Sequence, residues 1–248
     1  MEKEDSIGPT FAELNKRSIT AVLLILGAAA GWACVLGLTH LITRQDARLE
    51  AQAAARGQHA LHAGRAAEAM EDFRTALLYD RENASDALGL AEALLGLGKI
   101  EEARNSLQRL REHEPENGQV NLALARIAVQ QNDSDAAEQY YHSAIYATWP
   151  ESLASVRQQA RLELVGYLLS QQKRPQAQAE LMSLAANAGD NTALRLQVAD
   201  LLMLARDPGH ALALYRQVLR QNRHNDAAHL GVERAQTALA SENAGEEN

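Results

Sequence analysis

Cysteine, proline and aromatic residues are scarce in this chain of 248 residues, which has one cysteine, five prolines and 4% aromatic residues. The single cysteine, Cys34, excludes an internal disulfide framework and a zinc site built from cysteines. Alanine and leucine dominate the remaining composition, and with so little proline they favour α-helix through most of the chain. The composition therefore predicts an all-α protein.

Basic residues are also in deficit, since the formal net charge is −8. Nucleic-acid binding depends on clustered lysine and arginine side chains that neutralise phosphates, so no nucleic-acid partner is expected. Charges of both signs are interspersed along the chain, a pattern that is typical of solvated helix faces.

Motifs for catalysis and metal binding are missing as well. The sequence contains no glycine-rich phosphate loop, no serine nucleophile elbow and no H-E-x-x-H zinc motif. His59 and His62 have the spacing to share a helix face, but no further ligand completes a site, and we interpret both as partly exposed helix histidines. We therefore expect neither an enzyme nor a metal or cofactor site.

Residues 19–43 form a long run without charge, long enough to cross the hydrocarbon core of a bilayer as a helix. We predict a transmembrane helix there, behind a short N-terminal tail (1–18). A signal peptide cleaved after Ala30 would not require the apolar residues that continue to Ile42. A lipoprotein site at Cys34 lacks the usual flanking residues, and a buried core helix would differ from the amphipathic helices downstream.

Basic residues flank this run on both sides, so the positive-inside rule gives nearly a tie. Lys16 and Arg17, directly before the run, look like a signal-anchor, which would place the C-terminal part in the periplasm of a bacterium; the cytoplasmic alternative stays open. Gly27 and Gly31 form a G-x-x-x-G spacing that supports dimerisation of membrane helices, although small residues are common in such helices.

The rest of the chain repeats itself with a period of 34 residues. The stretch "GRAAEAMEDFRTALLYDREN" begins at Gly64, and "GKIEEARNSLQRLREHEPEN" begins at Gly98. With Glu50 as position 1, position 20 is always alanine and position 24 is always large. Six additional residues precede the fourth repeat, and the five repeats are 50–83, 84–117, 118–151, 158–191 and 192–225.

This pattern resembles the tetratricopeptide repeat family. The resemblance implies two amphipathic helices per repeat, which stack into an α-solenoid over residues 44–240 because no single pair can bury its apolar face alone. A lone capping helix is expected at 226–240, followed by a disordered acidic tail at 241–248. Two departures are Arg56, at a position that is otherwise apolar, and the insertion after Pro150.

In this family the first helix of each repeat lines the concave surface. The resemblance therefore implies an apolar groove with sparse charge that binds a protein or peptide partner. The alternative is that many of the apolar groove positions only pack against the next repeat. The predicted groove residues are Leu61, Leu88, Glu92, Leu95, Leu122, Arg126, Val129, Leu162, Leu169, Leu196, Asp200 and Met203.

An aromatic cluster lies next to the insertion, at Tyr140, Tyr141, Tyr146 and Trp149. Tyr141 occupies a core position of the repeat. The other three either anchor an interface, where tyrosine and tryptophan are enriched, or cover the gap that the insertion opens.

These observations predict a non-catalytic, membrane-anchored scaffold with a tetratricopeptide solenoid behind one transmembrane helix. The layout resembles bacterial inner-membrane scaffolds that serve cytochrome c maturation, pilus assembly or polysaccharide export. The alternative is a structural self-association module, a homodimer formed through Gly27 and Gly31.

Overall fold

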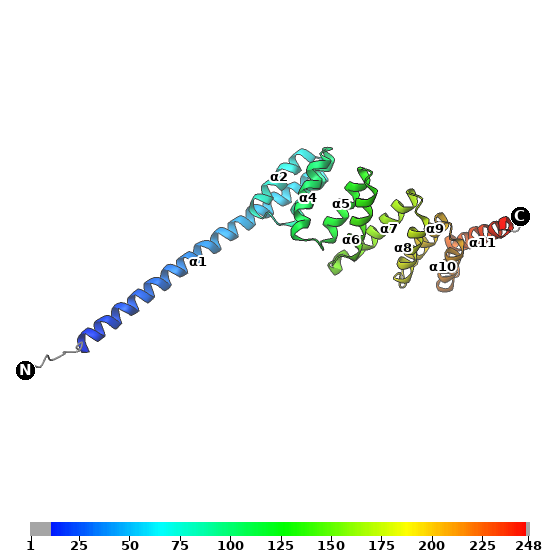
Figure 1. The fold of residues 1–248 in the computed structure, drawn as a ribbon. Coiled ribbons are helices and arrows are strands. Elements are labelled where there is room, and N and C mark those ends of the chain that lie inside the picture. Colours follow the sequence, from blue (N-terminus) through cyan, green and yellow to red (C-terminus); the bar gives the residue numbers. More distant parts are fainter. Residues whose placement is uncertain (1–10, 247–248) are drawn as a thin grey trace, which may run out of the picture. The chain divides into compact units, whose positions relative to one another are not determined.

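The computed structural model describes residues 11–246, with side chains from 31 to 242, and this part of the chain is built from helices without a β-strand (Figure 1). The prediction of an all-α fold is confirmed. A 3-10 turn at Glu151–Leu153 precedes α7. The helices are α1 (Phe11–His62), α2 (Ala66–Tyr79), α3 (Ala84–Gly96), α4 (Ile100–His113), α5 (Gly118–Gln130), α6 (Ser134–Tyr146), α7 (Ala154–Ser170), α8 (Arg174–Ala186), α9 (Thr192–Leu204), α10 (Pro208–Gln221) and α11 (Asp226–Glu246).

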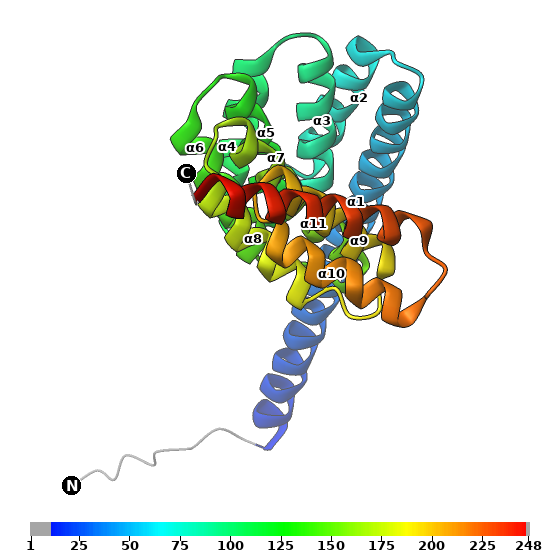
Figure 2. The same cartoon turned by 90° about the vertical axis from the view of Figure 1, so that its right-hand side faces the viewer.

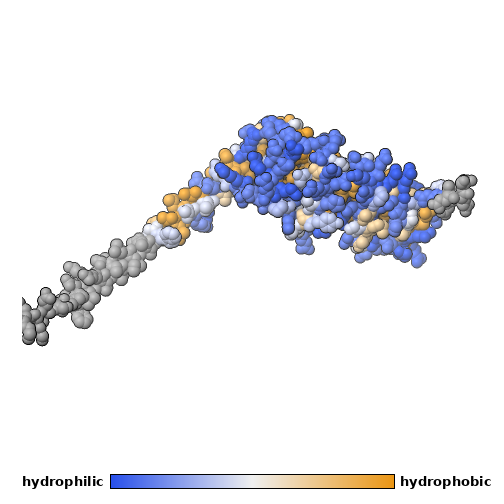
Figure 3. All heavy atoms as spheres, in the orientation of Figure 1, coloured by the Kyte–Doolittle hydropathy of each residue, from blue (hydrophilic) through white to orange (hydrophobic). Residues whose placement is uncertain are grey.

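The first helix, α1, runs without a break through 52 residues, from upstream of the predicted span into the first repeat. Residues 19–30 of that span, Gly27 included, lie outside the described side chains. Among the side chains that are described, no helix is long and apolar enough to cross a membrane. Figure 3 shows hydrophobic residues along α1 next to the grey segment. The large apolar side chains exposed there are Trp32, Val35, Leu36, Leu38, Leu41 and Ile42.

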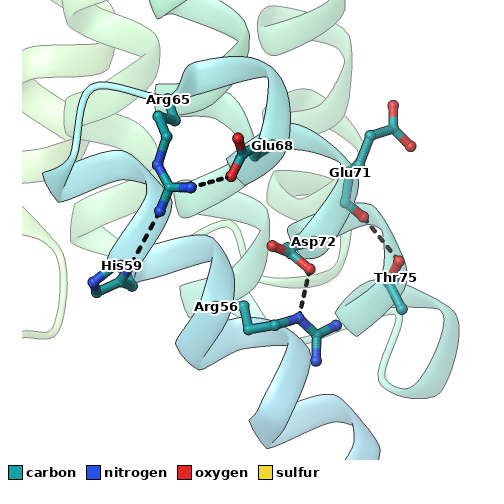
Figure 4. Close-up of polar contacts among 7 residues, drawn as sticks. All are labelled: Arg56, His59, Arg65, Glu68, Glu71, Asp72 and Thr75. Carbon is teal, nitrogen blue, oxygen red and sulfur yellow. Dashed lines mark hydrogen bonds and ion pairs between the residues drawn. The ribbon is translucent and has the colours of Figure 1, made fainter.

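The helices fall into two compact units, residues 1–93 and 94–248. In the first unit, the C-terminal part of α1 packs against α2. The Phe73 ring lies so close to Gly57 and Gly89 that an added Cβ would come within 3.0 Å and 2.4 Å of it, respectively. Arg56, the departure from the apolar pattern, points out of this core and forms an ion pair of 2.9 Å with Asp72 of α2 (Figure 4).

In the second unit, consecutive helices pack as the pairs α5–α6, α7–α8 and α9–α10, and their buried residues join one hydrophobic core. The last helix, α11, packs against both α9 and α10 and is red in Figure 2. It extends to Glu246, so the predicted disordered tail is helical over 241–246, while 247–248 lie outside the described residues. Tyr215 packs on Gly231 of α11, where an added Cβ would be 2.4 Å from the ring.

Two local features set the ends of the first helices. In every repeat except the third, position 34 is an asparagine that caps the next first helix, with Oδ1 accepting from the backbone N–H three residues on, at Asn83, Asn117, Asn191 and Asn225. Position 15 ends each first helix with a positive φ between 57° and 72°, a left-handed conformation that favours glycine. The residues at position 15 are Gly64, Gly98, Asn132, Gln172 and Arg206.

Polar side chains at position 21 join successive repeats within the second unit. Arg104 donates to Gln131 (3.4 Å), and Gln178 donates to the backbone oxygen of Ala205 (2.9 Å). Glu138 accepts from Lys173 at 2.5 Å. In each case the partner lies in the turn between the two helices of the following repeat, so this edge of the stack is fixed by polar contacts.

The six-residue insertion lengthens a helix. α7 has 17 residues, whereas α5 and α9 have 13. Because the insertion displaces the asparagine position, α7 begins after Leu153 without a side-chain cap.

The position-20 alanines are completely buried, and Ala177 of α8 lies within the core of the second unit. We expect Ala177→Leu to overpack the α7–α8 pair and to lower the free energy of unfolding by about 1–3 kcal/mol. The matched control is Ala179→Leu, two residues away on the exposed face of α8, which we expect to change it by less than about 0.5 kcal/mol. Urea unfolding measures both; equal effects would contradict the assigned repeat positions.

A second expectation concerns pH and Asp86, which is 2% exposed in the first turn of α3. Burial, followed by a hydrogen bond with Glu50 and the charges of Glu50 and Asp80, raises the pKa of Asp86 from 3.8 to about 7. The folded state then holds this proton more tightly than the unfolded state does. Stability is therefore lost as the pH rises from 3.8 to about 7, and this group changes it no further above that range.

We expect the free energy of unfolding to fall across this window by up to ~1.4 kcal/mol per pH unit. Asp86→Asn should flatten the profile and stabilise the protein above neutral pH, while Asp135→Asn, an exposed control, should keep the wild-type profile. Urea unfolding across the pH range is the measurement. An unchanged slope in Asp86→Asn would show that Asp86 does not carry the pH dependence.

Candidate partner-binding surface

The first helices of the second unit present a polar row that joins neighbouring repeats. Arg126 of α5 forms two hydrogen bonds with the Glu163 carboxylate of α7, at 2.9 Å and 2.8 Å. Asp200 of α9 accepts from Arg234 of α11 at 2.9 Å. We call this surface the first-helix face and define it by Arg126, Glu163, Gly166, Asp200 and Arg234.

Gly166 of α7 is exposed and contributes no side chain to this row, and we call this gap the opening. A Cβ added at Gly166 would meet no atom within 4 Å, so the space above this residue is open. Four of the predicted groove residues on the same helices are half-buried and pack against the core of the unit. They are Val129, Leu169, Leu196 and Met203.

Two predicted groove residues are buried and do not lie on this surface. Leu122 is 2% exposed and Leu162 is 9% exposed, so neither contacts a partner in this conformation. Both belong to the hydrophobic core, which is the packing role that the sequence left open for the apolar groove positions.

The remaining predicted groove residues are divided between the two units. Leu61, Leu88 and Glu92 belong to residues 1–93, where the two leucines are half-buried and Glu92 is exposed. Leu95, also half-buried, belongs to the second unit.

Two tyrosines behind the first-helix face act as neutral hydrogen-bonding and packing groups. Burial raises the pKa of Tyr141 to about 12, with the nearby Glu163 carboxylate adding to the effect. Burial also raises the pKa of Tyr215, whose hydroxyl donates to Asp200 at 2.6 Å. The rings of Tyr141 and Tyr167 lie 6.3 Å apart. The hydrogen bond from Tyr215 thus helps to hold the Asp200 carboxylate of the row in place.

The aromatic cluster separates into different environments. Tyr141 is buried, while the Arg111 guanidinium lies over the Tyr140 ring at 5.1 Å. Tyr146 is exposed and stacks on His142 with ring centroids 6.2 Å apart. Trp149 is half-buried, and its indole N–H donates to the Ala144 oxygen at 2.7 Å. The sequence did not indicate the partners of Tyr140, Tyr146 and Trp149, because these contacts depend on the path of the inserted loop.

The histidine pair of α1 forms local polar contacts. Arg65 donates to His59 Nδ1 at 3.3 Å and to Glu68 at 2.5 Å (Figure 4). The ring of His62 lies 3.5 Å from the side-chain amide of Gln58. Among the described side chains, no group of three or more histidine, cysteine, aspartate and glutamate residues is placed to hold a metal ion.

Comparison with known proteins agrees with this architecture. Residues 88–152 match the tetratricopeptide repeat family, and no curated protein matches the chain. Among solved structures, the pilF protein of Pseudomonas aeruginosa is 18% identical with a TM-score of 0.57, over 80% of this chain and 88% of that one. The MamA protein is 14% identical with a TM-score of 0.52, over 71% of this chain and 93% of that one.

A tetratricopeptide repeat protein from Parabacteroides merdae is 12% identical with a TM-score of 0.53, over 78% of this chain and 74% of that one. At these identities the likeness concerns the fold. The match identifies tetratricopeptide repeats over residues 88–152, and the chain shares the helical solenoid fold of these structures.

Proposed function

We propose that this chain is a non-catalytic adaptor that binds a segment of a protein partner on the first-helix face of its second unit. The opening at Gly166 carries the proposal. In a solenoid whose first helices otherwise join through the pairs Arg126–Glu163 and Asp200–Arg234, this position leaves room for a partner side chain. The half-buried apolar residues Val129 and Leu169 flank the polar row and offer hydrophobic contact.

Membrane anchoring is part of the same proposal. The uncharged run 19–43 lies within one continuous helix, and the apolar side chains described at its C-terminal end are exposed to solvent. An exposed apolar helix surface of this kind is covered by lipid or by another helix. We place the anchor in a bacterial inner membrane, with the repeats in the periplasm and a role in envelope assembly of the cytochrome c, pilus or export type.

The alternative function is self-association through Gly27 and Gly31. Gly31 has open space around its Cβ position, which leaves room for a second helix. This alternative concerns α1 only and is compatible with partner binding by the repeats.

Filling the opening tests the partner site. A photo-crosslinking residue at position 166 in cells would first identify the partner. We then expect Gly166→Arg to weaken capture of that partner at least tenfold. The fold should be kept or stabilised by about 0.5–1 kcal/mol, because glycine is unfavourable inside a helix.

Gln139→Arg is the matched control, since Gln139 is exposed on α6, the second helix of its repeat. Co-purification and thermal unfolding give the two readouts. Unchanged capture by Gly166→Arg, or equal loss in both variants, would rule out the first-helix face at this position.

Topology is tested separately, by fusing alkaline phosphatase and green fluorescent protein after Asn248 in a bacterial host. We expect active phosphatase and no fluorescence, because a signal-anchor places the repeats in the periplasm. Fluorescence without phosphatase activity would place them in the cytoplasm and move the partner search there. The partner experiment does not depend on this outcome.

A further inference from the structure

The loops before α5 and α7 line a second surface of the second unit, which shares no residue with the first-helix face. A cavity of about 690 Å³ lies between residues 114–119 and residues 148–150. A second cavity of about 360 Å³ lies between Trp149, the first two turns of α7 and Leu194 at the start of α9. Trp149 and Pro150 line both cavities, so the two are adjoining parts of one surface.

Trp149 is held rigidly between these cavities. Its indole N–H donates to the Ala144 oxygen, and Asn117 forms an isolated parallel β-bridge with Thr148. The ring lies so close to the start of α5 that a Cβ on Gly118 would be 2.2 Å from it, a contact that only glycine permits. The half-exposed ring is therefore a pre-organised platform, which lowers the entropic cost of binding.

The larger cavity is acidic. Glu114 and Glu116 line it, and no arginine or lysine does. Glu114 accepts a hydrogen bond from the Asn117 side chain at 2.8 Å, which orients its carboxylate, and Glu116 is exposed. With the Trp149 ring in the same lining, this cavity suits a cationic side chain.

The smaller cavity is lined by more basic than acidic side chains. Arg157 and Arg161 line it, against one carboxylate, Glu151. The Arg161 side chain is 9% exposed and donates to Ser183 at 2.8 Å, and its Nε forms an ion pair of 3.2 Å with Glu180. Arg157 is therefore the cation of this lining that is open to a ligand. The start of α7 adds positive potential because no side chain caps it.

We propose that this surface, centred on Trp149, binds an extended peptide segment of a partner protein. A basic side chain of the segment enters the cavity of Glu114 and Glu116. An acidic side chain enters the cavity of Arg157, and the backbone between them crosses the Trp149–Pro150 platform. Grooves lined by aromatic side chains suit extended, proline-rich segments, and the opposite charges of the cavities fix the direction of the chain.

Trp149 reports on binding directly, because Trp32 is the only other tryptophan. The full chain carrying Trp32→Phe, purified in detergent, is titrated with capped decapeptides rich in proline that contain one lysine and one glutamate at spacings of two to five residues. We expect a saturable change in Trp149 fluorescence for a subset of spacings. Replacing either charged residue of such a peptide by glutamine should weaken binding at least tenfold.

Charge reversal in the protein identifies the cavities. Glu116→Lys should abolish the preference for lysine over glutamine in the peptide, and Arg157→Glu should abolish the preference for glutamate. Arg216→Glu, an exposed control on α10, should leave both preferences unchanged. Gly166→Arg should also leave them unchanged, which separates this surface from the first-helix face. The proposal is overturned if no peptide gives a saturable change, or if glutamine peptides bind as tightly as charged ones.

Discussion

Close approach of two helices within each repeat is the constraint on which the rest of this structure depends. It requires a residue without a long side chain at position 20, and that position is a completely buried alanine in all five repeats. With the helices this close, the large residue at position 24 reaches past its own pair. Phe73 then packs on Gly89 of the following repeat, and Tyr215 packs on Gly231 of the last helix, α11. One small side chain thus determines contacts both inside a repeat and between repeats.

Polar contacts fix how successive helices are placed in this stack. Asparagine caps start the first helices, side chains at position 21 reach the next turn, and ion pairs join first helices across repeats. Each of these interactions is worth little alone, since exposed ion pairs contribute about 0–1 kcal/mol and a helix cap about 1 kcal/mol. Their shared effect is to fix the spacing of successive helices, so that the surfaces on either side of the stack have defined shapes. The insertion before α7 has the opposite effect. It displaces the asparagine position, so no side chain caps the start of α7, which lies beside the smaller cavity.

Much of this fold was predictable from the 34-residue period, because the position-20 alanines follow directly from it. Other features of the fold are not indicated by the local sequence. Gln172 and Arg206 adopt the left-handed turn that glycine provides in the first repeats, and the turn geometry overrides residue preference there. The burial of Leu122 and Leu162 depends on how far neighbouring repeats overlap, which a periodic pattern does not specify.

The candidate surfaces were less predictable than the fold. Arg126 and Asp200 were expected to face a groove, but their ion pairs with Glu163 and Arg234 depend on helix-to-helix distances. The contact between Trp149 and Gly118 joins residues 31 positions apart through an irregular loop, so no spacing rule indicates it. Asp86 reads as an ordinary first-turn carboxylate, and its burial, together with the approach of Glu50 from α1, raises its pKa.

The uninterrupted course of α1 has a mechanical consequence. An α-helix turns about 100° and rises about 1.5 Å for each residue. Because α1 contains no break between its upstream segment and the turns that pack on α2, the angular position of the first helix pair about this axis is set by residue count. One residue added or removed near Arg44 would turn that pair by more than a quarter of a circle relative to everything upstream. The number of residues in α1 therefore determines the direction in which the first repeat faces.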